Sequence, residues 1–124
     1  MPSPSTRACG DHFEAAAGAY LERQGYIIVA KNYRTRFGEI DIIARKGSIM
    51  CFVEVKASQT ERFGDPIEKI TAAKRRTIIR VARQFLAKDD RWRDFDPRFD
   101  VITFHRNRLD DEAVIQHFED AFRS

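Results

Sequence analysis

Four charged residues stand at alternate positions in two neighbouring segments that favour β-structure. Glu39 and Asp41 lie in the first segment, and Glu54 and Lys56 lie in the second. Because side chains alternate between the two faces of a strand, each pair points to one face of its own strand. Carboxylates gathered beside a lysine could hold a divalent cation and act on a phosphate ester.

A hairpin would bring the two segments together. The Lys46-Gly47 dipeptide between them predicts a two-residue turn. The resulting register places Asp41 opposite Phe52 and Glu39 opposite Glu54. One face of the ribbon then carries all four charged residues. The other face is expected to be apolar and buried, with Ile40, Ile42, Val53 and Val55.

Such a cluster of acids needs compensation. Two carboxylates about 4 Å apart repel by roughly 1 kcal/mol in water and by about 4 kcal/mol at a protein surface. Lys56 offsets part of this repulsion, and a hard cation such as Mg²⁺ or Mn²⁺ would relieve the rest. The alternative is that Glu54 and Lys56 form cross-strand ion pairs on a solvated face without any function.

The elements that must position these residues form an αβββαβ order with a further short strand. Apolar spacing predicts helices over residues 11–24 and 66–88, the second with Asp65 as its N-cap. Alternating and β-branched residues predict strands over 26–31, 39–45, 48–56, 99–105 and 113–118. The fold class is therefore α/β, with a mixed central sheet flanked by helices.

Composition limits the organisation and the location of the protein. A chain of 124 residues with 43% hydrophobic and 33% charged residues predicts one domain over residues 10–124, after a flexible tail over residues 1–9. No segment is apolar enough for a secretory signal or a membrane span, so we expect a cytoplasmic protein. Cys9 and Cys51 have no paired spacing, which argues against a zinc site and a disulfide.

Basic side chains concentrate on the second predicted helix. Against the single acid Glu68, this segment carries Lys69, Lys74, Arg75, Arg76, Arg80, Arg83 and Lys88. Such a stripe could follow a phosphate backbone, although a solvated outer face balanced by acids elsewhere is the alternative. Lys74 falls on the apolar stripe and is expected either to point toward the carboxylates or to extend along the surface into solvent.

Shorter motifs give weaker signals. Arg34, Arg36 and Phe37 mix cations with an aromatic ring, as single-strand binders do, although such runs also anchor loops. The three histidines, His12, His105 and His117, lack the spacing of metal ligands and are expected to be structural.

Two runs resemble a known family. Residues 37–43 (FGEIDII) and 52–56 (FVEVK) resemble the YraN-like family of small uncharacterised bacterial proteins, itself similar to archaeal Holliday-junction resolvases. Ile40 replaces the proline of the family motif, and Phe13 stands where glycine is usual. The remaining matches lie at Glu14, Tyr20-Leu21, Phe63-Gly64, Lys74, Arg98-Phe99-Asp100-Val101-Ile102 and Ala121-Phe122.

The resemblance implies a restriction-endonuclease-like core of the PD-(D/E)xK type. Asp41 matches the aspartate of the motif, and Glu54 and Lys56 match its (D/E)xK element. Glu14 matches an extra acidic residue of the resolvase-like branch, although a capping box with Asp11 is an equal alternative for it.

These observations predict a metal-dependent endonuclease that hydrolyses phosphodiester bonds, with branched DNA as a candidate substrate. Mg²⁺ or Mn²⁺ would be bound by Asp41, Glu54 and Val55. Lys56 would orient the attacking water or stabilise developing charge, with Glu14 and Glu39 as auxiliary residues. The predicted nucleic-acid contacts are Lys74, Arg76, Arg80, Arg83 and Arg36.

The expected partner is nucleic acid, DNA rather than RNA, without a membrane, and a homodimer is left open. One alternative is a non-catalytic nucleic-acid-binding module on the same fold. Another is an interaction protein that binds no nucleic acid. Metal-dependent cleavage separates the first two of these functions, and salt-dependent binding separates the last two.

Overall fold

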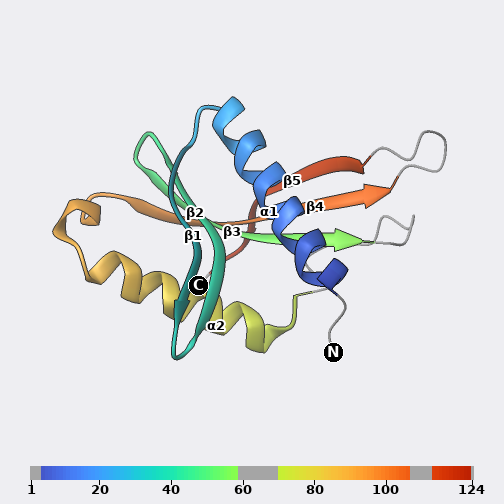
Figure 1. Cartoon of the computed structure of the whole chain (residues 1–124). Coiled ribbons are helices and arrows are strands. Elements are labelled where there is room, and N and C mark those ends of the chain that lie inside the picture. Colours follow the sequence, from blue (N-terminus) through green and yellow to red (C-terminus); the bar gives the residue numbers. More distant parts are fainter. Residues whose placement is uncertain (1–3, 59–69, 107–112, 124) are drawn as a thin grey trace.

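A twisted five-stranded sheet carries one long helix on each face. The computed structural model describes residues 4–58, 70–106 and 113–123 (Figure 1). The elements are α1 (Pro4–Arg23), β1 (Ile27–Thr35), β2 (Gly38–Lys46), β3 (Ile49–Ser58), α2 (Ala72–Ala87), a short 3₁₀ helix (Asp90–Trp92), β4 (Asp96–Arg106) and β5 (Ala113–Phe122). The strands lie in sequence order, and only β3 and β4 run parallel. This parallel pair needs a crossover, and α2 lies within it.

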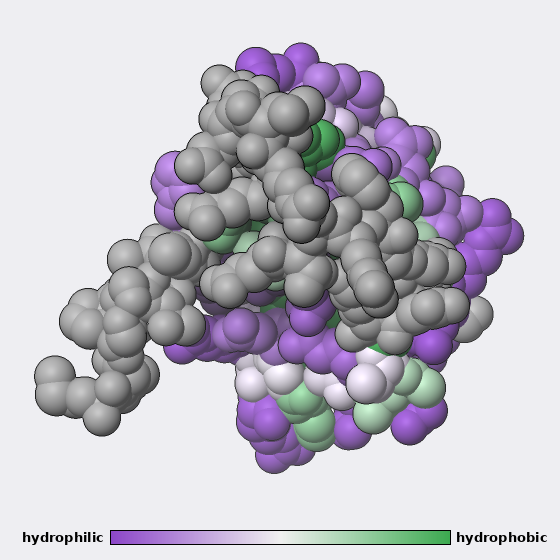
Figure 2. Space-filling view, turned by 90° about the vertical axis from the view of Figure 1, so that its right-hand side faces the viewer, coloured by the Kyte–Doolittle hydropathy of each residue, from purple (hydrophilic) through white to green (hydrophobic). Residues whose placement is uncertain are grey.

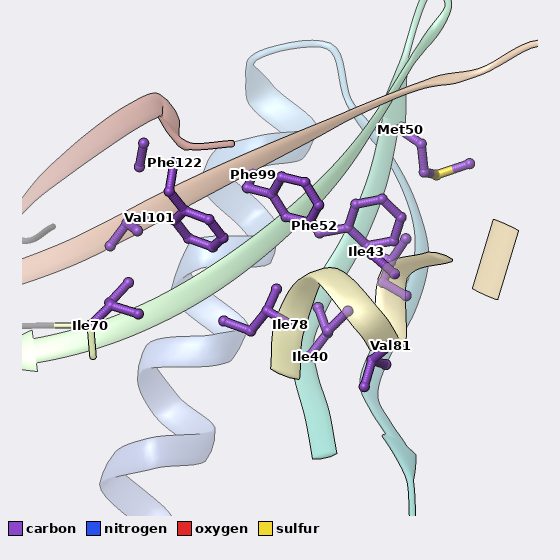
Figure 3. Close-up of a cluster of buried hydrophobic side chains, with 12 residues drawn as sticks. Ile40, Ile43, Met50, Phe52, Ile70, Ile78, Val81, Phe99, Val101 and Phe122 are labelled. Carbon is purple, nitrogen blue, oxygen red and sulfur yellow. The ribbon is translucent and has the colours of Figure 1, made fainter. Parts of the chain in front are cut away.

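The two faces of the sheet bury two separate hydrophobic clusters. The α2-side cluster joins strand residues Ile43, Phe52, Phe99 and Val101 to Ile78, Val81 and Ala82 of the helix (Figure 3). The α1-side cluster joins strand residues Ile42, Cys51, Val53 and Ile102 to Ala17 and Leu21. The predicted mixed α/β fold, with a sheet flanked by helices, is therefore confirmed.

Both helices begin at residues that differ from the prediction. Helix α1 starts at Pro4 rather than near Asp11. Helix α2 starts at Ala72, because the Thr71 hydroxyl accepts a hydrogen bond from the Lys74 amide and caps the first turn. Ile70 is buried but precedes the helix. The predicted cap at Asp65 lies outside the described residues.

The β2–β3 hairpin turns one residue later than predicted. Its turn is Gly47-Ser48 rather than Lys46-Gly47, because the left-handed residue, Gly47 with φ 58°, takes the first turn position. Ile43 rather than Asp41 therefore lies opposite Phe52, and the predicted register was wrong. The register differs by two residues, so every side chain keeps its predicted face along the paired part of the hairpin.

One side chain lies on the opposite face of the sheet from the one predicted. Ile40 was expected beside Ile42 but belongs to the α2-side cluster. In this part of β2 the strand pairs with β1 alone and runs toward α2. At its end, a Cβ added to Gly38 would lie 2.3 Å from Cγ2 of Thr77, so only glycine lets the strand approach the helix this closely.

Among the described residues, neither helix is both long and apolar enough to cross a membrane.

Candidate functional site

The carboxylates meet where β2 and β3 separate. The register between these strands ends with Ile42 opposite Val53, and the next residues on the two strands are Asp41 and Glu54. The Val55 amide donates a hydrogen bond to Oδ2 of Asp41 at 2.8 Å. A side chain thus replaces the main-chain carbonyl that would accept this bond in a continuing ladder. The strand separation gives Asp41 a fixed position beside β3.

The two acids have little contact with solvent. Asp41 is 9% exposed and Glu54 is 7% exposed. Burial and the nearby charge of Glu54 raise the pKa of Asp41 to about 6, although the Val55 amide opposes the shift. Burial also raises the pKa of Glu54, against the lowering effect of Lys74 and Lys56. The two carboxyls therefore resist ionising together, and a nearby cation would favour the doubly ionised form.

Two lysines approach the same oxygen from different elements. Nζ of Lys56 on β3 lies 3.6 Å from Oε1 of Glu54, and Nζ of Lys74 on α2 lies 3.9 Å from it. Their side chains are 38% and 40% exposed, so the ammonium groups lie between the buried acids and solvent. Both distances exceed a close hydrogen bond, which leaves both groups able to contact an anion. The expectation that Lys74 points toward the carboxylates is confirmed.

Glu39 lies close to this site but has its own partner. Its Oε2 lies 2.8 Å from Nε of Arg34 on β1. Its charge nevertheless contributes to the raised pKa of Asp41, after burial and the charge of Glu54. Glu39 was expected opposite Glu54, yet its observed cross-strand neighbour is Arg34.

The remaining two predicted site residues differ in position. Val55 donates its amide to Asp41, and the carbonyl of an extended residue points to the same edge as its amide, here toward Asp41. Glu14 is half-buried on α1, which packs against the opposite face of the sheet from α2.

The predicted basic residues divide into two groups. At about 100° per residue, Arg76 and Arg83 lie roughly 140° to 160° around α2 from the buried Ile78, and both are exposed. Arg80 instead lies against the β1–β2 turn, with its guanidinium carbon 3.6 Å from the ring centroid of Phe37. The guanidinium carbon of Arg36 lies 4.7 Å from the same centroid.

Sequence reasoning missed a polar row beside Lys56. Lys56 pairs with Thr103 on β4, and Thr103 pairs with Gln116 on β5. Directly paired residues share a face, so the row extends from the lysine across the sheet. The Thr103 hydroxyl lies 3.0 Å from Nε2 of His105, and both residues are buried. Alternation within β4 could have revealed this row, because these polar residues continue the face of Phe99 and Val101.

A buried ion network on the α1 side was also missed. Asp100 is fully buried and accepts hydrogen bonds from Nε of Arg98 at 2.9 Å and from Nη2 at 2.8 Å. Nε2 of His117 lies 2.7 Å from Oδ2 of Asp100, and the Asp120 amide donates to Oδ1 at 3.0 Å. Burial opposes ionisation of Asp100, but these bonds outweigh it and hold the pKa of Asp100 well below its usual range.

The network reaches the α1 helix and the start of β1. Nη2 of Arg98 also donates to the Tyr26 hydroxyl, and the Tyr20 hydroxyl lies 3.1 Å from Nδ1 of His117. The free thiol of Cys51 lies 3.9 Å from Nη2 of Arg98, and burial raises its pKa. This set is well satisfied internally, and it lies on the other face of the sheet from Lys74, which indicates a structural role.

The donor set suits a hard divalent cation. Across residues 4–58, 70–106 and 113–123, no three His, Cys, Asp or Glu side chains converge as metal ligands. Mg²⁺ needs fewer, since it is commonly held by one or two carboxylates and keeps several waters. Asp41 and Glu54 supply two carboxyls, and burial is the main cause that raises the pKa of each.

Strands β3 and β4 both run toward the right of Figure 1. Seen from that side, the described surface is mostly hydrophilic, with smaller hydrophobic areas between the polar ones (Figure 2).

Comparison with known proteins places the chain in a family. A family model described as uncharacterised protein family UPF0102 matches residues 13–104. A UPF0102 protein of Chlorobium chlorochromatii is 42% identical over 125 residues, covering 98% of this chain and 95% of that protein. A UPF0102 protein of Syntrophotalea carbinolica is 45% identical over 109 residues, covering 88% and 86%. One of Nitrosomonas europaea is 42% identical over 113 residues, covering 91% and 92%. The chain therefore belongs to the uncharacterised protein family UPF0102, which the YraN-like resemblance indicated.

Proposed function

We propose that the protein is a metal-dependent endonuclease that hydrolyses phosphodiester bonds in DNA. The observation that carries this proposal is the pair of buried carboxyls, Asp41 and Glu54, at a strand separation with Lys56 beside them. This arrangement is similar to the PD-(D/E)xK site that the sequence motif implies, on a core of the restriction-endonuclease type. The mixed sheet with one helix on each face is compatible with that core.

Asp41, Glu54 and the carbonyl of Val55 would hold Mg²⁺ or Mn²⁺. When bound, such an ion supplies Lewis acidity at a phosphoryl oxygen and activates water for attack. The three donors are hard oxygens from two adjacent strands, and one of them is already oriented by the Val55 amide. Burial makes ionisation of both carboxyls unfavourable, and a bound cation would offset this cost.

The two lysines have different roles. Lys56 lies on the same strand as Glu54 and would stabilise the negative charge that develops on the phosphate during attack. Lys74 reaches the site from the first turn of α2 and would position the phosphate. The charge of Glu39 helps to raise the pKa of Asp41, and Glu39 itself forms an ion pair with Arg34.

The test is cleavage by the purified chain of branched, single-stranded and duplex DNA, with matched RNA, in the presence of Mn²⁺. Wild type should cut at least one DNA substrate, and EDTA should abolish the activity. Asp41→Asn should be inactive. In single turnover, Lys56→Ala should cut at least about a hundredfold more slowly, because losing one transition-state charge contact typically costs 10² to 10³ in rate.

Arg23→Ala is the matched control, since Arg23 is an exposed cation in the last turn of α1, away from the carboxylates. It should cut like the wild type. If the wild type cuts no substrate, the hydrolase proposal is wrong and a non-catalytic nucleic-acid-binding module replaces it. If Asp41→Asn cuts as fast as the wild type, the assigned site is wrong.

A further inference from the structure

A groove lies between the β1–β2 turn and the C-terminal half of α2. Its volume is about 640 Å³, and its lining includes Arg34, Arg36, Phe37, Gln84 and Lys88. Ligand pockets that hold one small molecule measure roughly 300 to 1,000 Å³, so the groove has room for one or two nucleotides and none for a duplex. Three of the seven lining residues are cations, which suits a polyanionic occupant.

Phe37 and Arg36 of the groove lining form a wall of flat groups, and Arg80, which is not a lining residue, lies against the same ring. The ring of Phe37 is half-buried, and the guanidinium carbons of Arg80 and Arg36 lie 3.6 Å and 4.7 Å from its centroid. Nucleobases stack on aromatic rings and on guanidinium planes, and this stacking tolerates any base. Bases within a duplex are already stacked on one another, so only an unpaired base can use such a wall.

Three cations in or beside the groove are not neutralised by nearby acids. Within the described part of the chain, no carboxylate lies within ion-pair distance of Arg36, Arg80 or Lys88, whereas Arg34 is paired with Glu39. Their charge is therefore available to phosphate groups.

The groove and the carboxylates lie beside the same side of α2. One side of α2 carries four residues that are spaced three, seven and four positions apart, namely Lys74, Thr77, Gln84 and Lys88. Thr77 touches the β1–β2 turn at Gly38, between the two sites. Lys74 and Gln84 are separated by about 15 Å along the axis, at 1.5 Å per residue. At the rise of about 3.4 Å per nucleotide in stacked DNA, this length corresponds to at most about four nucleotides, because an unpaired strand is more extended.

We propose that this groove binds an unpaired nucleotide of the substrate, on the strand that passes the carboxylates of Asp41 and Glu54. The position of the scissile phosphate in this proposal rests on the proposed function, whereas binding in the groove does not require turnover. The substrate class is then single-stranded DNA or a branched DNA with an unpaired segment next to the cleavage position.

The test is fluorescence anisotropy with a labelled twelve-nucleotide thymidine strand and with a labelled duplex of equal length. It uses the Asp41→Asn protein without divalent metal, so that binding is measured apart from cleavage. The single strand should bind more tightly than the duplex. Adding Phe37→Leu or Arg36→Ala should weaken single-strand binding by about fivefold to 150-fold, the range expected for losing one base stack. Melting followed by circular dichroism should verify that each variant is folded.

Arg23→Ala on the same background is the control and should bind like its parent. The groove proposal would be wrong if Arg83→Ala and Arg36→Ala weakened single-strand binding equally, because Arg83 lies on the outer surface of α2. Duplex binding as tight as single-strand binding would also overturn it. If the groove binds the single strand but the wild type cuts nothing, only the hydrolase proposal is wrong. If the wild type cuts in a metal-dependent way but both groove variants bind like their parent, only the groove proposal is wrong.

Discussion

At the scale of single residues, the carboxyl pair of Asp41 and Glu54 is costly to ionise in the folded protein. Asp41 has exchanged water for one amide hydrogen bond and a neighbouring acid, and its pKa rises to about 6 as a result. Lys56 and Lys74 both approach Glu54 and lower its pKa, but burial outweighs their effect. Buried carboxyls with raised pKa values are common at functional sites.

Asp41→Asn should therefore stabilise the metal-free protein at neutral pH. The folded pKa of about 6 lies above the ordinary value of 3.8, so the folded state retains the proton more strongly. The free-energy cost of ionising Asp41 in the folded protein is absent below about pH 3.8 and complete above about pH 6. Above that pH, the substitution should add on the order of 1 to 3 kcal/mol to the free energy of unfolding. Urea unfolding at pH 7.5 and pH 4.5 measures this, and the gain should shrink at the lower pH.

The control for this measurement is Asp90→Asn, because Asp90 is a 92% exposed acid. It should change stability little at either pH. An Asp41→Asn protein that is less stable than the wild type at pH 7.5 would show that the amide hydrogen bond to Asp41 outweighs the cost of burial and of the charge on Glu54.

Local alternation was enough to select the residues of the candidate site, although it could not place them. It put Glu54 and Lys56 on one face and Val53 on the other, as observed. The register was wrong by two residues, yet a shift of two preserves the face of each side chain. The strand separation beside Asp41 depends on how β2 approaches α2, and no local pattern encodes it.

At the scale of elements, the Arg98–Asp100–His117 network joins β4 to β5 and to the β1 and α1 region. Asp100 is fully buried, and Arg98 is 18% exposed. Its members are separated by up to 97 residues, as in the pair of Tyr20 and His117. Sequence spacing carries no signal for such pairs, which is why the network was not predicted. Helix α2 illustrates the same limit, since its Thr71 cap is a weaker sequence signal than the Asp65-Pro66 pattern.

Asp100→Asn should destabilise the protein strongly without affecting the carboxylate site. Removing one partner of a buried pair leaves an uncompensated charge and typically costs about 3 to 5 kcal/mol. The exposed pair of Asp90 and Arg93, 3.2 Å apart, provides the matched comparison. Asp90→Asn should cost less than about 1 kcal/mol. Denaturant unfolding measures both, and equal small losses would mean that the buried network contributes no more than a surface pair.

At the scale of the whole molecule, the two faces of the sheet carry different polar groups. The α1 side holds the internally satisfied network around Asp100, and the α2 side holds the buried acids, the two lysines and the nearby groove. The chain order of helices and strands was predictable because each element carries its own periodicity. Which face receives which helix was not, because it depends on the crossover between β3 and β4.

Metal binding should be visible as stability of the entire chain. A ligand that binds only the folded state adds about 2.7 kcal/mol at a hundredfold excess over its dissociation constant. For a domain of this size, that corresponds to a rise in melting temperature of roughly 5 to 15 °C. Mn²⁺ should produce this rise in the wild type and in Asp90→Asn at pH 7.5. It should produce little rise in Asp41→Asn or Glu54→Gln, measured against the metal-free melting temperature of each variant.

The same experiment at pH 5 separates the carboxylate site from adventitious binding. Because the pKa of Asp41 is raised to about 6, protons compete with Mn²⁺ for it at pH 5, and the wild-type shift should shrink. Exposed carboxylates of ordinary pKa remain ionised at that pH, so metal bound at such groups would give a nearly unchanged shift. An equal Mn²⁺ shift in the wild type, Asp41→Asn and Glu54→Gln would place the metal elsewhere on the molecule.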